Sequence, residues 1–156
     1  MKKSNSRMEL LRRVASFGTG VEDLKNVYFL FVRSQLEQSA VVWHSSLSEE
    51  NKSDLERVQK SAVKIIMGEK YQSYQKSLAL LDMETLEDRR ENLCLKFAQR
   101  CLKNDKAKKM FPINQKSGMK TRKMEKYHVQ HANTDRLQNF ALIYMQNLLN
   151  ENEKTC

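Results

Sequence analysis

The chain has 156 residues, a formal net charge of +9 and a mean hydropathy of −0.71. This length allows one or at most two compact domains, and no apolar run approaches the length of a membrane span, so we expect no membrane partner. Four glycines and one proline are too few for a turn-rich β-sandwich. Abundant Leu, Met, Lys, Glu and Gln favour helices, which predicts an all-α fold of about five or six helices.

Apolar spacing predicts a first helix over about residues 5–17, which the glycine-containing segment 18–20 ends. A second helix begins near Val21. Its apolar residues cover more than one stripe, so we expect it to be the most buried helix. It either continues to His44 or breaks near Ser39.

Three further helices carry recognisable end signals. Ser48 is placed to cap a third helix that Gly68 ends, and Ser73 is placed to cap a short fourth one. Thr85 and Asp88 fit a capping box, with Asp in place of Glu, at the start of a fifth helix that extends to about residue 103. The residues expected to line the inner face of the fifth helix are Leu86, Leu93, Cys94, Phe97 and Cys101.

The C-terminal part begins at a break at residues 111–112. No apolar period follows until residue 131, so we expect a basic loop with a short extended piece at residues 127–129. Asn133 or Thr134 caps a last helix to about residue 150, whose apolar side holds Leu137, Phe140, Ala141, Tyr144, Leu148 and Leu149. The expected organisation is a helical domain over residues 1–111, a basic loop or linker over 112–131, a C-terminal helix over 132–150 and a frayed tail over 151–156.

No cluster of catalytic residues is visible in the sequence. Polymerase chemistry needs carboxylates that hold two metal ions, and no Asp-Asp pair occurs. The adjacent Glu49 and Glu50 fit a helix start, where acids are favoured by the helix dipole. The glycine-containing segment 18–20 is no phosphate-binding loop, and His44 beside Ser45 fits a helix end. We therefore expect no catalytic site and no cofactor, and the chain is not expected to be an enzyme by itself.

The cysteines indicate packing rather than metal binding. Cys94 and Cys101 are seven residues apart, two turns along one helical face, as buried core cysteines are. Joining them to His128 and His131 would match no familiar zinc spacing, so no metal site is expected. With three cysteines and no apparent secretion signal, we expect reduced thiols and an intracellular location, nuclear or cytoplasmic.

The positive charge is concentrated in two segments. Residues 1–20 hold five basic residues and one acidic residue, and residues 103–126 hold nine basic residues and two acidic ones. RNA or DNA would be attracted to both through phosphate contacts, and an aromatic ring among the basic residues can stack on a base. A solvated surface with one docked aromatic explains the same pattern. The candidates in these segments are Arg7, Arg12, Arg13, Lys116, Lys120, Arg122, Lys123 and Lys126, the last followed by Tyr127.

Several short sequence motifs follow one another at characteristic spacing. They are Val-Tyr at 27–28, Phe-Val-Arg at 31–33, Val-Trp-His at 42–44, the block 55–66, Leu-Glu-Asp-Arg-Arg at 86–90, Phe-Pro at 111–112 and Ala-Asn-Thr-Asp-Arg-Leu at 132–137. Together they resemble the thumb and post-thumb region of reverse transcriptases from LINE-type, non-LTR retrotransposons. The chain departs from that family where Gln38 and Val41 replace a tyrosine and a proline, where Ser61 replaces a basic residue, and where Ile143 replaces a proline.

The resemblance implies a non-catalytic, thumb-like piece of an RNA-directed DNA polymerase, without the fingers, palm and endonuclease. Such a piece would contact the sugar–phosphate backbone of RNA or of an RNA–DNA duplex. The resemblance makes four residues candidates for that contact or for packing on a palm: Arg33, Arg57, Lys60 and Lys64. Arg33 and Arg57 are equally placed for ion pairs with acids such as Glu37 and Asp54. A helical protein-interaction module is the alternative function, and an enzyme in its own right is the third.

Overall fold

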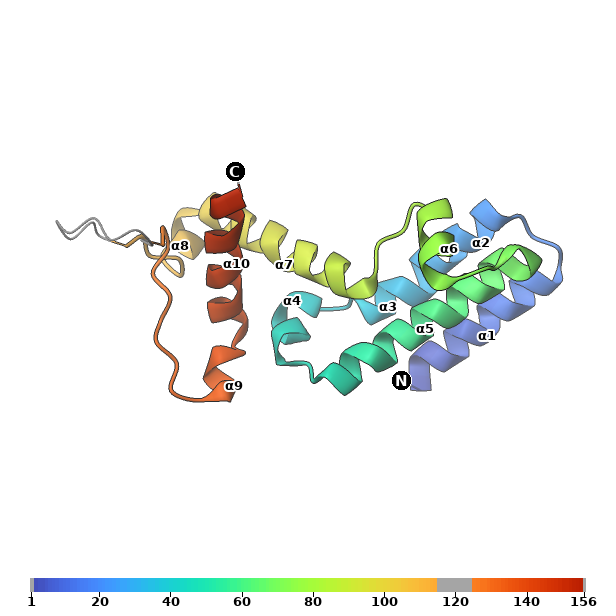
Figure 1. The fold of residues 1–156 in the computed structure, drawn as a ribbon, viewed down its shortest axis with the longest axis horizontal. Coiled ribbons are helices and arrows are strands. Elements are labelled where there is room, and N and C mark those ends of the chain that lie inside the picture. Colours follow the sequence, from blue (N-terminus) through green and yellow to red (C-terminus); the bar gives the residue numbers. More distant parts are fainter. Residues whose placement is uncertain (1, 115–124, 156) are drawn as a thin grey trace. The chain divides into compact units, whose positions relative to one another are not determined.

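The computed structural model describes residues 2–114 and 125–155, with side chains for residues 6–114 and 125–153. The described residues form helices and no strand, which confirms the all-α class (Figure 1). Contacts divide the chain into an N-terminal unit, residues 1–40 and 47–90, and a C-terminal unit, residues 41–46 and 91–156. The division at residue 90 differs from the expected helical domain over residues 1–111.

The N-terminal unit is built around one long amphipathic helix, α5 (Glu49–Met67), which packs against α1, α2 and α6. Figure 1 shows α1 and α5 side by side. The other elements are α1 (Lys2–Ser16), α2 (Val21–Val27), the π-helix η1 (Tyr28–Arg33), α3 (Ser34–Leu36), the 3₁₀ helix η3 (Gly68–Lys70), α6 (Tyr74–Leu80) and the first turns of α7 (Leu86–Leu102). The core holds Met8, Leu11, Leu24, Tyr28, Val32, Leu36, Ala62, Val63, Ile66, Met67, Leu78, Leu81, Met83 and Leu86.

The expected helix caps are confirmed. The Ser48 hydroxyl accepts a hydrogen bond from the Asn51 amide at 3.3 Å, and the Ser73 hydroxyl accepts one from Lys76 at 3.4 Å. Thr85 accepts from the Asp88 amide at 3.1 Å and donates to the Asp88 carboxylate at 2.6 Å. These bonds satisfy amides that a helix leaves without internal partners, so the local sequence sets the starts of α5, α6 and α7.

The second predicted helix breaks at Ser39, one of the two outcomes left open. Ser39 has φ 57°, a left-handed conformation that an L side chain adopts at a cost. We therefore expect Ser39→Gly to raise the free energy of unfolding by about 0.5–1 kcal/mol. Ser34→Gly is the control, because Ser34 is helical, with φ −53°, and glycine there should destabilise by a similar amount. Urea denaturation of both variants measures the difference, and destabilisation by Ser39→Gly would contradict the prediction.

The segment after Val21 is less buried than expected. Residues 28–33 form a π-helix, which places Leu30 and Phe31 on the surface with 69% and 47% of their area exposed. The expectation that this is the most buried helix is therefore wrong. Tyr28 and Val32 do point into the core, so the apolar residues of this segment divide between the core and the surface.

A buried chain of hydrogen bonds joins η1, α5 and α6. The Tyr28 hydroxyl donates to the Gln59 side-chain oxygen at 2.7 Å, and the Gln59 amide donates to the Tyr74 hydroxyl at 3.0 Å and to the Glu84 carbonyl at 2.9 Å. Tyr74 in turn donates to the Glu56 carboxylate, whose other oxygen accepts from the Leu86 amide at the start of α7. The polar side chains of this network thus satisfy one another and hold α6 and the first turn of α7 on α5.

This network predicts a loss of stability at alkaline pH. Burial raises the pKa of Tyr28, and burial together with the bond to Glu56 raises the pKa of Tyr74. Above pH about 10 the unfolded chain releases both protons while the folded chain keeps them, so each tyrosine should lower the free energy of unfolding by about 1.4 kcal/mol per pH unit. In Tyr28→Phe, the free energy of unfolding should fall less steeply with pH, as measured by urea denaturation at several pH values between about pH 8 and pH 11. Parallel slopes for the two proteins would contradict this.

The C-terminal unit contains the rest of α7, which packs with α10 (Ala141–Thr155) around a second core. Its short elements are residues 41–43 of α4 (Ala40–Trp43), the 3₁₀ helix η2 (His44–Ser46), α8 (Asp105–Lys108) and α9 (Asp135–Gln138). The second core holds Cys94, Ala98, Cys101, Phe111, Tyr127, Met145, Leu148 and Leu149. Cys94 and Cys101 are both buried, as the helical spacing predicts.

The prediction of one last helix that ends at about residue 150 is wrong, because the structure has two helices and the second ends at Thr155. Thr134 caps the short α9, and the chain breaks at Asn139 before α10 continues to Thr155. The hydroxyls of Ser45 and Ser46 donate to the Asn139 carbonyl at 2.7 and 3.2 Å, and this carbonyl would accept from residue 143 in an unbroken helix. The two serines thus take the place of a helical hydrogen bond at the break.

Three apolar residues of the later helices that were expected to face inward are exposed, among them Leu137 at 37%. Phe97 is 42% exposed because Cys94, Ala98 and Cys101 form the buried stripe of α7, which leaves Phe97 at its edge. Phe140 is 54% exposed because it lies at the break before α10.

Candidate nucleic-acid interface

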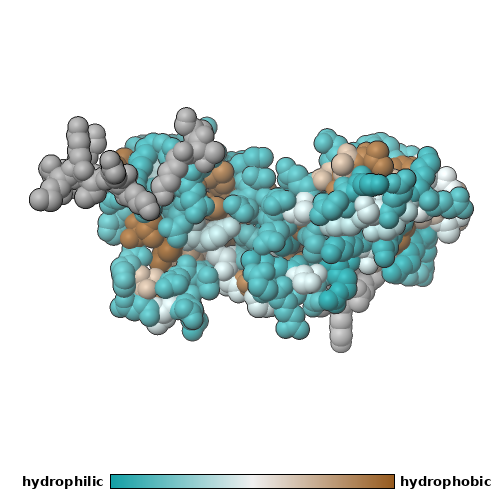
Figure 2. Space-filling model, in the orientation of Figure 1, coloured by the Kyte–Doolittle hydropathy of each residue, from teal (hydrophilic) through white to brown (hydrophobic). Residues whose placement is uncertain are grey.

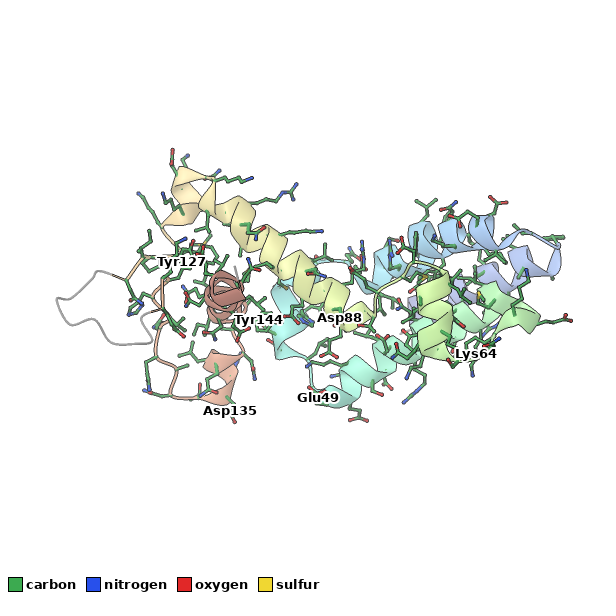
Figure 3. The ribbon with its side chains drawn as sticks, turned by 45° about the horizontal axis from the view of Figure 1, so that its top comes forward. Glu49, Lys64, Asp88, Tyr127, Asp135 and Tyr144 are labelled. Carbon is green, nitrogen blue, oxygen red and sulfur yellow. The ribbon has the colours of Figure 1, made fainter. Side chains whose placement is uncertain are left out.

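The exposed face of α5 carries a row of three cations, Arg57, Lys60 and Lys64, which we call the α5 ridge. Their spacing of three and four residues places them on one side of the helix. The buried residues of α5 are Gln59, Ala62, Val63, Ile66 and Met67, so the core stripe turns the ridge toward solvent. Figure 3 labels Lys64, which lies toward the C-terminal end of the helix.

Aromatic rings support the two ridge lysines. The Lys60 ammonium lies 5.3 Å from the centre of the Tyr74 ring, and the Lys64 ammonium lies 5.5 Å from that of Tyr71. Within the described residues, neither lysine is in ion-pair distance of a carboxylate. A cation–π contact holds the side chain without neutralising its charge, so both ammonium groups can still attract phosphate. The two tyrosines lie beyond Gly68, outside α5, so the spacing of residues along this helix does not indicate them.

Arg57 forms an ion pair as well as belonging to the ridge. Its guanidinium lies 2.8 Å from the Asp54 carboxylate, one turn earlier, and its side chain is 72% exposed. The expected alternative of an ion pair is therefore observed for this residue. An exposed pair at this spacing is weak, and a guanidinium has five donors, so Arg57 keeps the capacity to bind a second acceptor.

A surface groove of 590 Å³ lies between α1 and α5. Its lining residues are Met8, Glu9, Arg12, Asp54, Arg57, Val58 and Ser61. Arg12 lies 3.2 Å and Arg13 lies 3.8 Å from the Glu9 carboxylate, on the exposed side of α1. The structure thus brings Arg12, predicted from the N-terminal basic segment, to the same groove as Arg57.

Two other predicted contacts are turned toward the protein. Arg7 donates to the Phe31 carbonyl of η1 at 2.6 Å. Arg33 lies 3.7 Å from the Glu37 carboxylate and 3.6 Å from the centre of the Phe29 ring, with 17% of its side chain exposed. Burial and the neighbouring Arg89 lower the pKa of Arg33. Arg7 and Arg33 therefore stabilise the packing of η1 and α3 and do not belong to the α5 ridge.

In the C-terminal unit, Lys126 belongs to a short antiparallel stem. The backbone amide of Asn114 donates to the Lys126 carbonyl at 3.0 Å, and the backbone amide of His128 donates to the Pro112 carbonyl at 2.8 Å. The expected extended piece thus begins at Tyr127, which bridges to Ile113 and is labelled in Figure 3. The Lys126 ammonium lies 2.6 Å from Glu153, which raises its pKa. The other predicted contacts, Lys116, Lys120, Arg122 and Lys123, lie outside the described residues.

Buried Asn150 anchors this stem to α10. Its side-chain oxygen accepts from the Tyr127 amide at 2.9 Å, and its side-chain amide donates to the Tyr127 carbonyl at 3.0 Å. One amide side chain therefore satisfies both backbone groups of a buried residue, as a neighbouring strand would. The sequence carries no visible signal for this contact, because an asparagine near a helix end fits many roles.

The described residues offer little for other kinds of chemistry. Among residues 2–114 and 125–155, no three His, Cys, Asp or Glu side chains are grouped closely enough to hold a metal ion. His44 is buried, with its ring edge toward Tyr144 at 5.6 Å between centroids. In the same part of the chain, no helix combines the length and apolar character that crossing a membrane requires. The groups best placed to meet a ligand are thus the cations of the α5 ridge and the groove beside it.

The chain matches no protein-family model, no curated protein and no solved structure.

Proposed function

We propose that this chain is a non-catalytic nucleic-acid-binding module of the thumb type found in reverse transcriptases of non-LTR retrotransposons. It binds the sugar–phosphate backbone of RNA or an RNA–DNA duplex. The observation that carries the proposal is the α5 ridge, where Lys60 and Lys64 present their charges to solvent on tyrosine rings. The order of the short sequence motifs and the all-α fold support an origin in this family. Arg12, Arg13 and the basic segment that contains Lys116, Lys120, Arg122 and Lys123 add to the attraction.

Binding through phosphate has a recognisable salt dependence. The logarithm of the association constant should fall linearly with the logarithm of salt concentration, by about 0.9 for each phosphate neutralised. Three ridge contacts therefore predict a slope of roughly −2.7 or steeper. Fluorescence anisotropy with RNA–DNA duplexes of two unrelated sequences measures it, and both should bind alike because phosphate contacts carry no sequence information. Failure to bind either duplex at low salt would disprove the proposed function.

A second candidate function rests on the exposed apolar residues of η1. Leu30 and Phe31 lie together on the surface of the N-terminal unit, where a protein partner could cover them. A helical protein-interaction module would bind one protein in a fixed ratio. It would keep that partner when Lys120, Arg122 and Lys123 are changed to glutamate, and Leu30→Gln with Phe31→Gln would release it. A nucleic-acid module predicts the opposite response to the two sets of changes.

A further inference from the structure

We infer that the groove between α1 and α5 is a binding site for one unpaired nucleobase, with guanine preferred. This inference rests on the proposed function, because the α5 ridge is what would hold the backbone of the same strand. The groove runs beside that ridge, and Arg57 belongs to both. A strand whose phosphates lie along Lys60 and Lys64 would therefore have the groove within reach of its bases.

The charges of the groove favour a neutral ligand over a phosphate. Two arginines, Arg12 and Arg57, face two carboxylates, Glu9 and Asp54, so the charged lining residues balance. On the ridge, in contrast, Lys60 and Lys64 have no carboxylate at ion-pair distance within the part of the chain that the structure describes. A phosphate gains more beside Lys60 and Lys64, because within the described residues no ion pair neutralises their charges. The groove is left for the uncharged part of a nucleotide.

The shape and lining of the groove suit a flat ring. Its volume of 590 Å³ is within the range of small-ligand sites. Val58 supplies apolar surface above the mostly buried Met8, and the planar guanidinium groups of Arg12 and Arg57 can stack on a base. The Ser61 hydroxyl, which donates to the Arg57 carbonyl at 2.9 Å, can still accept a hydrogen bond from a ligand.

The acceptors in the groove favour a base that donates hydrogen bonds. Glu9, Asp54 and Ser61 all offer oxygen acceptors, and a carboxylate can take several hydrogen bonds at once. Guanine presents a ring N–H and an amino group side by side on its Watson–Crick edge, which matches the two oxygens of one carboxylate. Uracil presents a single N–H between two carbonyl oxygens that the carboxylates would repel. Guanine should therefore bind best and uracil worst.

Three oligoribonucleotides of equal length and charge test this preference. One is uridine throughout, the second has guanosine at one central position, and the third has an abasic residue there. We expect the full chain to bind the guanosine strand roughly fivefold or more tightly than the uridine strand, with the abasic strand no better than uridine. All three should show the same salt slope, because their phosphates are identical.

Paired variants separate base recognition from charge. Glu9→Gln with Asp54→Asn removes two negative charges, so it should strengthen binding of the uridine strand while the guanosine preference is lost. The control, Glu50→Gln with Glu69→Gln, makes the same charge change at exposed positions outside the groove lining. It should strengthen binding of both strands and keep the preference.

The outcomes distinguish this inference from the proposed function. Equal binding of the guanosine and abasic strands, with a steep salt slope, would overturn the nucleobase site and leave backbone binding intact. Loss of the preference in the control variant would also overturn it. No binding of any strand at low salt would overturn the proposed function and the nucleobase site together.

Discussion

Reversing the charge of both ridge lysines, Lys60→Glu with Lys64→Glu, should weaken binding of an RNA–DNA duplex roughly tenfold or more at low salt. Each lysine that contacts a phosphate contributes about one unit to the salt slope, so the slope should become shallower by about two. The loss should be the same for duplexes of different sequence, because the contacts are to the backbone. Anisotropy titrations over a range of salt concentrations give both the affinity and the slope.

The matched control for this variant is Lys96→Glu with Arg100→Glu on α7. These residues are also exposed, four apart on a helix, and their reversal changes the net charge equally. The control should lower affinity less and leave the slope nearly unchanged. Both variants should unfold at nearly the same temperature as the unchanged protein, since the lost contacts of Lys60 and Lys64 with tyrosine are each worth about 0.5–1 kcal/mol at an exposed site. Equal losses from the two variants would mean that net charge, and not the α5 ridge, attracts the duplex.

The parts of the fold that sequence predicts correctly are those set by neighbouring residues. Ser48, Ser73 and Thr134 cap helices because a cap needs a side chain and an amide only three residues away. The break at Asn139 depends instead on Ser45 and Ser46, more than ninety residues earlier in the chain. No local pattern can show such a contact, and the continuous apolar spacing around Asn139 therefore predicted one helix where there are two.

In the candidate site, too, local features can be predicted from the sequence and features that depend on packing cannot. The spacing of Arg57, Lys60 and Lys64 on α5 is visible in sequence, and so is the choice between a phosphate contact and an ion pair for Arg33. What decides that choice is burial, because Arg33 lies against Phe29 and Glu37 while Lys60 lies at the surface. The groove has no signal in the sequence, since its two sides come from α1 and α5 and only packing brings them together.

Asn150→Ala should lower the free energy of unfolding of the C-terminal unit by about 2–4 kcal/mol. The change removes the bonds from Asn150 to the Tyr127 backbone amide and carbonyl, and leaves the carbonyl only a long bond of 3.5 Å from the Asn114 side-chain amide. A buried polar group left without a hydrogen bond costs about 1–3 kcal/mol. The effect should be local, because Asn150 is the buried attachment of the stem at residues 112–114 and 125–128 to α10, beside the exposed pair of Lys126 with Glu153. Hydrogen exchange at the Tyr127 amide should therefore accelerate more than exchange in the middle of α5.

Asn147→Ala is the control, because Asn147 lies one turn earlier on α10 and its side chain is exposed. It should change the stability by less than about 0.5 kcal/mol, since a surface substitution breaks no buried contact. The comparison also separates stability from binding. Suppose that Asn150→Ala weakens duplex binding, and that Lys60 and Lys64 still contribute to the salt slope. The stem that contains Lys126 then takes part in recognition. If both asparagine variants are equally stable, the contact between Asn150 and Tyr127 does not hold the stem on α10.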